Sequence, residues 1–576
     1  MDMTQAADWV SDGSAPDELL PWRRHFPDVA DWDGPLEVMT LSELLAAGVA
    51  RAGSRPLITF RNRTISFPEF AAQVDKLAAG LIALGLAPGS VLGLHLPNTP
   101  FHPLAFFAAA RAGLTVMHLS GLDAPRELDH KLRVSGARVL VTTNLPGFLP
   151  AALRLLEAVA VDTILVGDDA EWGPSTVADP LMIPERAGLS PLTRLREGPL
   201  PTFWPQRSPD DVMLLQFTGG TTGLPKAAML THGNLTAAVS MHRLWRDYLS
   251  PGENLDAFEA SMRTIGVLPL FHIYALTVVL LRAVRSGGEI LLRQRFDPEE
   301  IIADIAVRRA TVFAGVPTMW LALLNRPGIE AVDFSALRCC ISGGAPLPFE
   351  VQARLGRLLG RELVIGWGMT ETAPAGTLLP RTAARRPGVI GVPFPGVAMR
   401  VVSLDDSSRP VAPGETGELA IRGPNVFAGY LDQPEETQNA FRNGWFLTGD
   451  VGRMDEQGVF DLVDRRKNML ISGGFNVYPV VIEGAIYEHP DVAEVIVIGI
   501  PDPYLGQVPK AFVTLKPGVE AFSLEALQAF LAERIGRNEI PRALEFRETL
   551  PRSAAGKLLA SVLVAEERAK RQAQSA

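Results

Sequence analysis

The segment from Gln216 to Lys226 carries the residues that are best suited to chemistry in this chain. It reads Gln-Phe-Thr-Gly-Gly-Thr-Thr-Gly-Leu-Pro-Lys and begins inside the apolar run Val212–Phe217. Glycines let a backbone turn tightly and bring its N–H groups up to an anion, while threonine hydroxyls and a lysine add donors and charge. The segment therefore predicts a phosphate-binding loop rather than a plain surface turn. It is not a Walker loop, because the Walker spacing of glycines before Gly-Lys-Ser/Thr is absent.

Four later segments also concentrate glycine and polar residues. They are Gly366–Thr372, Trp445–Asp450, Asp464–Gly474 and Leu550–Lys557. Together with the first segment, and in this order, they resemble the motifs of the adenylate-forming superfamily of acyl-CoA synthetases, luciferases and peptide-synthetase adenylation domains. The resemblance covers roughly residues 35 to 560 and is nearest to bacterial fatty-acid–CoA ligases. One such motif is moderately specific, whereas five in order are very specific.

Length and composition describe an ordinary soluble globular protein. Of its 576 residues, 47% are hydrophobic and 20% are charged, and a chain of this length indicates two or more domains. The formal net charge is −10, so there is no overall basic field to attract nucleic acid, and we expect no such partner.

Cysteine usage and hydropathy favour the cytoplasm. Cys339 and Cys340 are adjacent within an apolar run, which predicts buried structural residues rather than a disulfide or a metal site. Residues Met1–Val10 show no signal peptide, and the longest apolar stretch, Ile273–Leu281, is too short to span a bilayer. Membrane association through a peripheral contact, and formation of a homodimer, stay open.

Apolar runs of strand type alternate with helical patterns over most of the chain. Short, continuous apolar strands with helical crossovers favour parallel-rich sheets covered by helices on both faces, an α/β fold. The predicted strands are Ser90–His95, Val139–Thr143, Thr163–Val166, Val212–Phe217, Ile290–Leu292 and Thr311–Phe313, and the predicted helices are Leu104–Ala112, Pro298–Arg309 and Phe349–Leu359.

The pattern changes near Asp464, where we place a domain boundary. An N-terminal adenylation domain, which binds ATP and the acyl group, would span residues 1–465, and a small α+β domain would span residues 466–576. The resemblance further implies a β-barrel-like subdomain in the large domain and a mobile C-terminal domain. The elements predicted in the small domain are helix Pro479–Glu488, strands Glu494–Ile498 and Ala511–Leu515, helix Leu524–Ile535 and strand Ala543–Phe546.

The resemblance implies a reaction in which a carboxylate attacks the α-phosphate of ATP. Two anions must be brought together, so catalysis rests on positioning and charge stabilisation. Lys557 would bridge the carboxylate and the α-phosphate, although a lysine near a C-terminus is usually a solvated charge. Thr370 would donate to the α-phosphate, and Glu371 would bind Mg²⁺ through a hard carboxylate oxygen.

Two further residues would hold the nucleoside. Trp367 stands where the family usually has tyrosine, and its ring would lie against adenine unless it is a core aromatic. Asp450 would accept hydrogen bonds from the ribose hydroxyls, and Arg465 would contact ribose or phosphate. The implied ATP- and AMP-binding residues are Thr218, Gly219, Gly220, Thr221, Thr222, Gly223, Lys226, Gly344, Ala345, Pro346, Gly366, Trp367, Gly368, Met369, Asp450 and Arg465.

Thioester formation would use the domain boundary. Lys467 matches the hinge about which the small domain turns between two poses, and Gly473, Gly474 and Phe475 would face the pantetheine of coenzyme A. Residues that depart from the family pattern are Ala227, Asn468, Glu539 and Ala560.

The segment Pro269–Leu276 resembles the wall of the acyl pocket. His272 is either a gate or a hydrogen-bonded core residue, and Tyr274 and Val316 would complete the wall. Small residues argue for room to admit a chain, and we expect them to line the channel apart from the nucleotide contacts. They are Ala373, Ala375 and Gly376.

These features favour an ATP-dependent ligase that joins a medium- or long-chain fatty acid to coenzyme A, with Mg²⁺ as cofactor and ATP and coenzyme A as co-substrates. One alternative is a CoA ligase for an aromatic or short-chain acid. Another is an enzyme that loads its adenylate onto a carrier protein. A non-catalytic protein on a retained fold is disfavoured, because Glu371, Asp450, Arg465 and Lys557 all persist.

Overall fold

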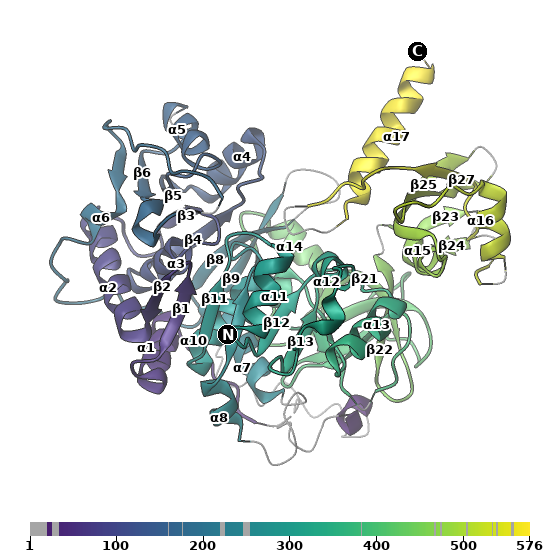
Figure 1. The fold of residues 1–576 in the computed structure, drawn as a ribbon, viewed down its shortest axis with the longest axis horizontal. Coiled ribbons are helices and arrows are strands. Elements are labelled where there is room, and N and C mark those ends of the chain that lie inside the picture. Colours follow the sequence, from purple (N-terminus) through teal and green to yellow (C-terminus); the bar gives the residue numbers. More distant parts are fainter. Residues whose placement is uncertain are drawn as a thin grey trace.

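The chain folds around three β-sheets (Figure 1), two in the large N-terminal part and one in a small C-terminal part. The computed structural model describes residues 20–25, 34–158, 160–175, 177–218, 225–245, 254–381, 383–465, 468–472, 475–502, 505–532, 534–536, 539–553 and 558–575. The predicted α/β class, with a large domain followed by a smaller one, is confirmed.

The first sheet has eight strands, and its central strands are parallel, as their apolar runs predict. Strand β9 runs antiparallel to β8 and is followed at the sheet edge by a short strand from far along the chain. In spatial order the strands are β19 (Gly429–Tyr430), β9 (Lys226–Thr231), β8 (Val212–Thr218), β4 (Thr115–Leu119), β3 (Val91–His95), β5 (Val139–Thr143), β6 (Thr163–Gly167) and β7 (Leu189–Pro191).

The second sheet has 14 strands and changes character halfway across. Pairing is parallel from β1 to β14 and antiparallel from β14 to β17. The strands are β17 (Ala398–Val402), β18 (Gly417–Arg422), β21 (Trp445–Met454), β22 (Phe460–Arg465), β16 (Val389–Pro393), β15 (Thr377–Leu378), β14 (Val364–Trp367), β13 (Cys339–Ser342), β12 (Val312–Gly315), β10 (Arg263–Gly266), β11 (Glu289–Leu292), β1 (Pro56–Phe60) and β2 (Arg63–Ser66), with β20 (Phe441–Arg442) beside β21.

The antiparallel half stands where we expected a β-barrel-like subdomain. Among the described strands it continues the parallel half instead of closing on itself, because β15 pairs with β14 on one side and with β16 on the other.

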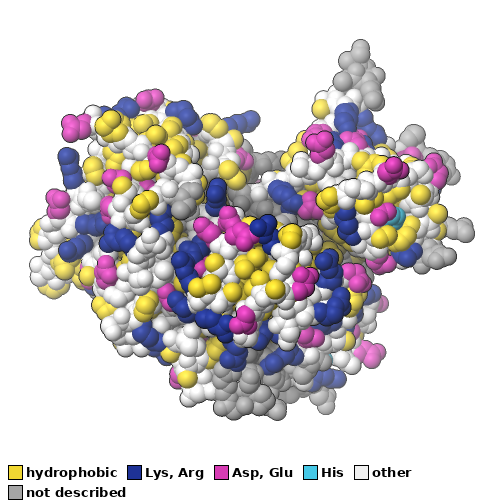
Figure 2. Space-filling model, in the orientation of Figure 1, with side chains coloured by type: hydrophobic (Ala, Val, Ile, Leu, Met, Phe, Trp, Pro, Cys, Tyr) yellow, Lys and Arg dark blue, Asp and Glu magenta, His cyan; other side chains and the backbone are white. Residues whose placement is uncertain are grey.

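The small part has a five-stranded sheet whose first strand follows β22 in the chain. It lies where the sequence predicts the small α+β domain. Its strands are β23 (Leu470–Ser472), β24 (Phe475–Val477), β25 (Val492–Asp502), β26 (Gly506–Leu515) and β27 (Ala543–Phe546), and its helices are α15 (Pro479–Tyr487), α16 (Leu524–Leu531) and α17 (Ala560–Ser575). These elements bury a hydrophobic core of their own, which contains Ile482, Val495 and Leu527. In the space-filling view the small part forms a separate lobe (Figure 2).

Helices of the large part mostly follow apolar stripes in the sequence. Helix α1 begins with a capping box, in which Thr40 Oγ1 accepts from the Glu43 N–H and the Glu43 carboxylate accepts from the Thr40 N–H. The α-helices are α1 (Leu41–Ala52), α2 (Phe67–Ala83), α3 (Phe101–Arg111), α4 (Pro125–Ser135), α5 (Leu149–Glu157), α6 (Leu192–Leu195), α7 (His232–Leu244), α8 (Leu255–Ala260), α9 (Ile273–Ala275), α10 (Arg282–Ser286), α11 (Pro298–Ala306), α12 (Pro317–Leu324), α13 (Phe349–Leu359) and α14 (Pro434–Ala440).

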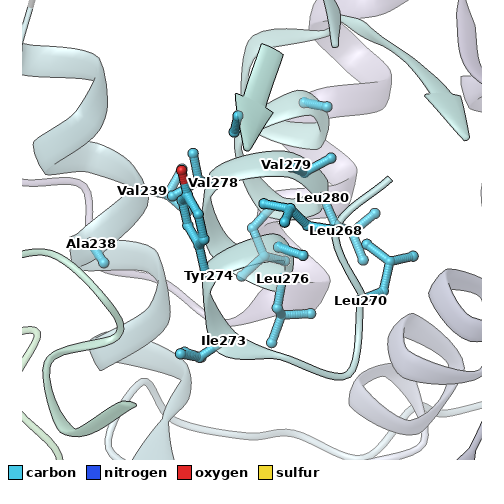
Figure 3. Packing of buried hydrophobic residues seen from close by; sticks show 14 of the residues in the cluster. Ala238, Val239, Leu268, Leu270, Ile273, Tyr274, Leu276, Val278, Val279 and Leu280 are labelled. Atoms are coloured by element: carbon cyan, nitrogen blue, oxygen red, sulfur yellow. The ribbon is translucent and has the colours of Figure 1, made fainter. Parts of the chain in front are cut away.

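Between α9 and α10 the helix widens into a π-helix, η5 (Leu276–Leu281). The predicted apolar stretch Ile273–Leu281 is thus a buried helical segment of the core, where η5 packs against α7 (Figure 3). No helix in the described ranges is long and apolar enough to cross a membrane. Cys339 and Cys340 lie buried and unbridged on β13, as predicted.

Candidate active site

A cleft of about 2750 Å³ runs between the large and small parts. Its lining includes the carboxyl ends of β8 in the first sheet and of β13 and β14 in the second. Ligands of α/β proteins usually bind at such ends of parallel strands. The predicted residues that line it in the large part are Thr218, Lys226, His272, Tyr274, Val316, Gly344, Ala345, Pro346, Gly366, Trp367, Gly368, Met369, Thr370, Glu371 and Asp450.

The expected phosphate loop joins β8 to β9 as a hairpin. Thr218 and Lys226 are direct register partners, so the two ends of the loop meet at the cleft. Gly219, Gly220, Thr221, Thr222 and Gly223 lie outside the described residues. The Lys226 Nζ lies 2.5 Å from Oε2 of Glu436 and 5.5 Å from the centroid of the Tyr430 ring. Its positive charge therefore already has an exposed carboxylate partner.

Thr370 and Glu371 form a single 3₁₀ turn, η7 (Thr370–Thr372), just after β14. The turn ends at Ala373, whose φ of 55° is left-handed. The Glu371 side chain is 5% exposed and accepts a hydrogen bond at Oε1 from the Tyr430 hydroxyl, 3.0 Å away. Burial, followed by the nearby Glu371 charge, raises the pKa of Tyr430 above its usual range, so its hydroxyl keeps the proton that it donates.

A short segment from 424 to 431 holds that turn in place. Asn425 is fully buried, and its Nδ2 donates to the carbonyl oxygens of Thr372 and Ala375 at 2.7 and 2.5 Å. The Phe427 N–H donates to the Glu371 carbonyl at 2.9 Å. Glu371, the candidate metal ligand, is thus held by hydrogen bonds both to its backbone carbonyl and to its side-chain carboxylate.

Trp367 and Asp450 are in direct contact. The indole Nε1 donates to Oδ2 of Asp450 over 2.8 Å, and the two residues are 8% and 3% exposed. They come from β14 and β21, which are not neighbours in the sheet. Trp367 therefore packs in the core and also borders the cleft, and its contact with adenine stays a prediction.

Another part of the cleft wall is formed by the backbone that follows β13. Gly344 has a φ of 79°, and a Cβ there would lie 3.4 Å from Val316 Cγ1. The neighbouring Gly343 would place a Cβ 3.1 Å from the Tyr274 ring. Small residues at this strand end therefore let the chain pass close to Tyr274 and Val316.

Several predicted residues are only partly described. The Arg465 backbone pairs with Asp450, as the last rung between β21 and β22, but its side chain is outside the description. The same holds for the Phe475 side chain on β24. Lys467, Gly473, Gly474 and Lys557 also fall outside the described residues; Arg552 and Leu558, which flank the Lys557 segment, pair with each other and line the cleft.

His272 caps a helix in the acyl-pocket wall. Its Nδ1 accepts a hydrogen bond from the Tyr274 N–H at 3.3 Å, at the start of α9, while the residue borders the cleft. Tyr274 is 8% exposed and its hydroxyl lies 3.5 Å from the Gly315 carbonyl oxygen. His272 is therefore a half-buried, hydrogen-bonded wall residue.

The structure does not place the small residues after Glu371 on the wall of the cleft, where we expected them to line the acyl channel. Ala373 and Ala375 are fully buried behind the wall, which Pro374 and Thr377 form instead. A Cβ on Gly376 would lie 2.4 Å from Trp367 Cε3. The indole ring therefore packs directly on this glycine, which we expected to lie apart from Trp367. The left-handed turn at Ala373 directs the chain inward, which alternation in sequence alone does not reveal.

The residues at η7 fit a hard divalent cation. Glu371 presents a carboxylate at the cleft, where the phosphates of a bound nucleotide and water would supply the other oxygens. When bound, such an ion would neutralise developing phosphate charge.

Sequence reasoning missed three residues of this site: Tyr430, Glu436 and Asn425. They reach it from elements that follow β18, more than 50 residues after Glu371. No local pattern points from Gly-Tyr or Pro-Glu-Glu to a carboxylate that distant in the chain. The one available signal was Asn425, a polar residue that stands after Gly423-Pro424 and before the apolar pair Val426-Phe427.

Comparison with known proteins assigns the chain that forms this cleft to a family. A family model described as "AMP-binding enzyme" matches residues 45–431, and one described as "AMP-binding enzyme C-terminal domain" matches residues 481–557. The chain belongs to the AMP-binding enzymes. The resemblance to the adenylate-forming superfamily is thereby confirmed.

Individual relatives narrow the type of enzyme. The chain is 35% identical over 569 residues to a long-chain-fatty-acid–CoA ligase of Bacillus subtilis, covering 95% of this chain and 98% of the relative. It is 37% identical over 500 residues to a feruloyl-CoA synthase of an Amycolatopsis species, covering 86% and 92%. The crystal structure of ATP-bound MatB from Rhodopseudomonas palustris superposes with a TM-score of 0.79 at 29% identity, covering 91% and 98%. The protein is an adenylate-forming CoA ligase, for which ATP and coenzyme A are the co-substrates.

Proposed function

We propose that this ligase activates a medium- or long-chain fatty acid. The acid would become an acyl-adenylate with release of pyrophosphate, and coenzyme A would then displace AMP to give the thioester. The observation that carries the proposal is the meeting in one cleft of Thr218, Lys226, Thr370, Glu371, Trp367 and Asp450 with a largely apolar wall. That wall includes Leu268, Ile273, Val278, Ile390 and Phe394.

In the first half-reaction the residues act by position and charge. Lys226 and Thr218 would hold the β- and γ-phosphates, and Thr370 would donate to the α-phosphate. Asp450, oriented by the Trp367 N–H, would fix the ribose, while the indole ring lies against adenine. Lys557 would stabilise the charge that builds between the carboxylate and the α-phosphate. Glu371, held by Tyr430, would bind Mg²⁺.

In the second half-reaction the small domain would turn about Lys467. We propose the boundary after residue 465 because β22 ends there and the next described strand, β23, belongs to the small sheet. Gly473, Gly474 and Phe475 would then border the pantetheine. Arg465 would stay beside the ribose.

The choice of a fatty acid is supported by the long-chain ligase relatives, which align over nearly their full length. A phenylpropenoic acid is the second candidate, because the feruloyl-CoA synthase relative shares 37% identity. Loading of a carrier protein is the third. We further propose a cytoplasmic enzyme that contacts membranes peripherally and forms a homodimer.

A coupled assay separates these candidates. Purified protein receives ATP, Mg²⁺ and acids from acetate to palmitate, plus 4-hydroxycinnamate, and AMP, pyrophosphate and acyl-CoA are quantified. The proposal expects AMP and acyl-CoA in equal amounts, with the highest kcat/KM for chains of about eight carbons or more, since each buried methylene contributes about 0.8 kcal/mol. A preference for the aromatic acid, or AMP without thioester, overturns it in favour of the second or third candidate.

A further inference from the structure

The apolar side of the cleft contains one histidine that nothing in the reaction explains. His242 lies near the end of α7, one turn after Val239, and both occupy the same side of that helix. Val239 belongs to the core that surrounds Tyr274 and Val278, where α7 meets η5 (Figure 3). His242 itself borders the cleft together with Val278 and Phe394.

The surroundings keep this imidazole neutral. It is 7% exposed, and its ring lies edge-on to Phe394 with centroids 4.6 Å apart. Burial, followed by the nearby Arg282 charge, lowers the pKa of His242 to about 3. At neutral pH the ring therefore offers one N–H donor and one lone pair, and no charge.

Within the described part of the chain, neither function is used. The buried Nε2 has no hydrogen-bond partner, and no hydrogen bond to Nδ1 occurs either. Neighbouring polar groups on this side are committed: the Thr377 hydroxyl donates to the Ile390 carbonyl at 2.6 Å, and the Tyr274 hydroxyl points at Gly315. Buried polar groups in native proteins are normally paired, so an unpaired imidazole at the border of the cleft can take a hydrogen bond from a ligand group there.

We propose that His242 is a specificity-determining residue that binds a hydroxyl group of the acid, carried on its chain or ring away from the carboxyl end. The inference rests on the proposed acid-activating function and names a narrower substrate class. A hydroxyl can donate and accept, so it suits either tautomer of the neutral ring. An ammonium group would have to give up its hydration beside an uncharged ring and close to the Arg282 charge, which disfavours cations there.

Two pairs of acids test the inference and separate the sources of the hydroxyl. One pair is 12-hydroxydodecanoate and dodecanoate, and the other is 4-hydroxycinnamate and cinnamate. Pyrophosphate release gives kcat/KM for each acid. We expect the native enzyme to prefer the hydroxylated member of at least one pair by about tenfold, the scale of one net hydrogen bond in a buried site. A ratio of one or less in both pairs overturns the inference without any variant.

Two variants then assign the preference to this residue. His242→Leu should lower the hydroxyl-to-deoxy ratio about tenfold, and His242→Gln, which keeps a donor and an acceptor, should restore much of it. A ratio unchanged in His242→Leu would place the hydroxyl contact elsewhere and overturn the inference. Activation of dodecanoate with no hydroxyl preference leaves the proposed function standing and refutes only this step, whereas no adenylate from any acid refutes both.

Discussion

The indole N–H of Trp367 donates a hydrogen bond to the carboxylate of Asp450 over 2.8 Å, which links β14 to β21 at the cleft. The ring that would face adenine and the carboxylate that would face ribose therefore form one unit, although 83 residues separate them. Neither can move without the other, because both are more than nine-tenths buried. Tyrosine, the usual residue at this position, cannot donate from the same atom.

Trp367→Phe tests that unit. The variant keeps an aromatic face but leaves Asp450 without its indole donor, so the dissociation constant of ATP should rise roughly tenfold. Calorimetric titration of ATP measures it. Trp320→Phe is the matched control, because Trp320 also donates its indole N–H, to the Ile341 carbonyl at 3.2 Å, but its donor contact lies away from Asp450. Equal weakening in both variants would show a general loss of stability and not a nucleotide contact.

Gly376→Ala should impair ATP binding and activity with every acid. The added methyl would collide with Trp367 Cε3 and Cζ3 at 2.4 and 2.5 Å, and the ring must shift. Gly356→Ala, in the interior of α13, should be tolerated or slightly stabilising, because the added Cβ would lie no closer than 3.8 Å to the Arg361 carbonyl oxygen. Thermal unfolding and kcat/KM for short and long acids are the measurements. A change confined to long acids would instead restore the channel-lining role expected from the sequence.

Tyr430→Phe removes one hydrogen bond from Glu371 and keeps the ring beside Lys226. We expect kcat for adenylation to fall about tenfold and the Mg²⁺ concentration for half-maximal rate to rise, since a less firmly held carboxylate binds the cation less well. Binding of Mn²⁺ to the protein with ATP, followed by electron paramagnetic resonance, should weaken in parallel. If the Mg²⁺ dependence of the rate is unchanged and only the melting temperature of the variant falls, Tyr430 contributes to packing and not to cation binding.

The small domain should lose stability as pH rises. Burial, reinforced by the Asp464 charge, raises the pKa of Glu483 from 4.5 to about 8. The folded state thus keeps a proton that the unfolded state releases above about 4.5, so this contribution is full below pH 4.5, declines up to about pH 8 and is constant beyond. Denaturant unfolding of the full chain at pH 5, 7 and 9 measures the decline. Glu483→Gln should remove it, while Glu488→Gln, at the exposed end of α15, should not.

Lys557→Ala should separate the half-reactions. Loss of one charge that stabilises the transition state lowers adenylation about 10²–10³-fold. Pre-made acyl-adenylate should still react with coenzyme A, because Lys557 would have turned away by then. Lys570→Ala, an exposed ion-paired lysine on α17, serves as the control. Equal loss in both steps would contradict a division of labour by domain rotation.

Most strands and helices could be predicted from the sequence, whereas the tertiary contacts between them could not. The run Val139–Thr143 is a strand with those same bounds, and Phe349–Leu359 is a helix with those same bounds, because apolar period and length determine both. The parallel order followed from buried strands with helical crossovers. Tyr430 beside Glu371, and Gly376 beneath Trp367, depend on contacts set by turns such as the left-handed Ala373, which no period encodes.

The segment from 424 to 431 has a consequence for how the large domain opens. It leaves the antiparallel half of one sheet after β18 and adds β19 to the edge of the other, where Ala428 and Leu431 donate to the backbone of β9. The side chain of Asn234 on α7 holds this segment, because its Nδ2 donates hydrogen bonds to the carbonyl oxygens of Pro424 and Val426 at 2.7 and 2.9 Å. Two sheets that are joined by one segment in this way should unfold in a single cooperative step. Amides of β8, β9 and β18 should therefore exchange hydrogen at one common, slow rate, and a chain cut between residues 424 and 431 should not reassemble.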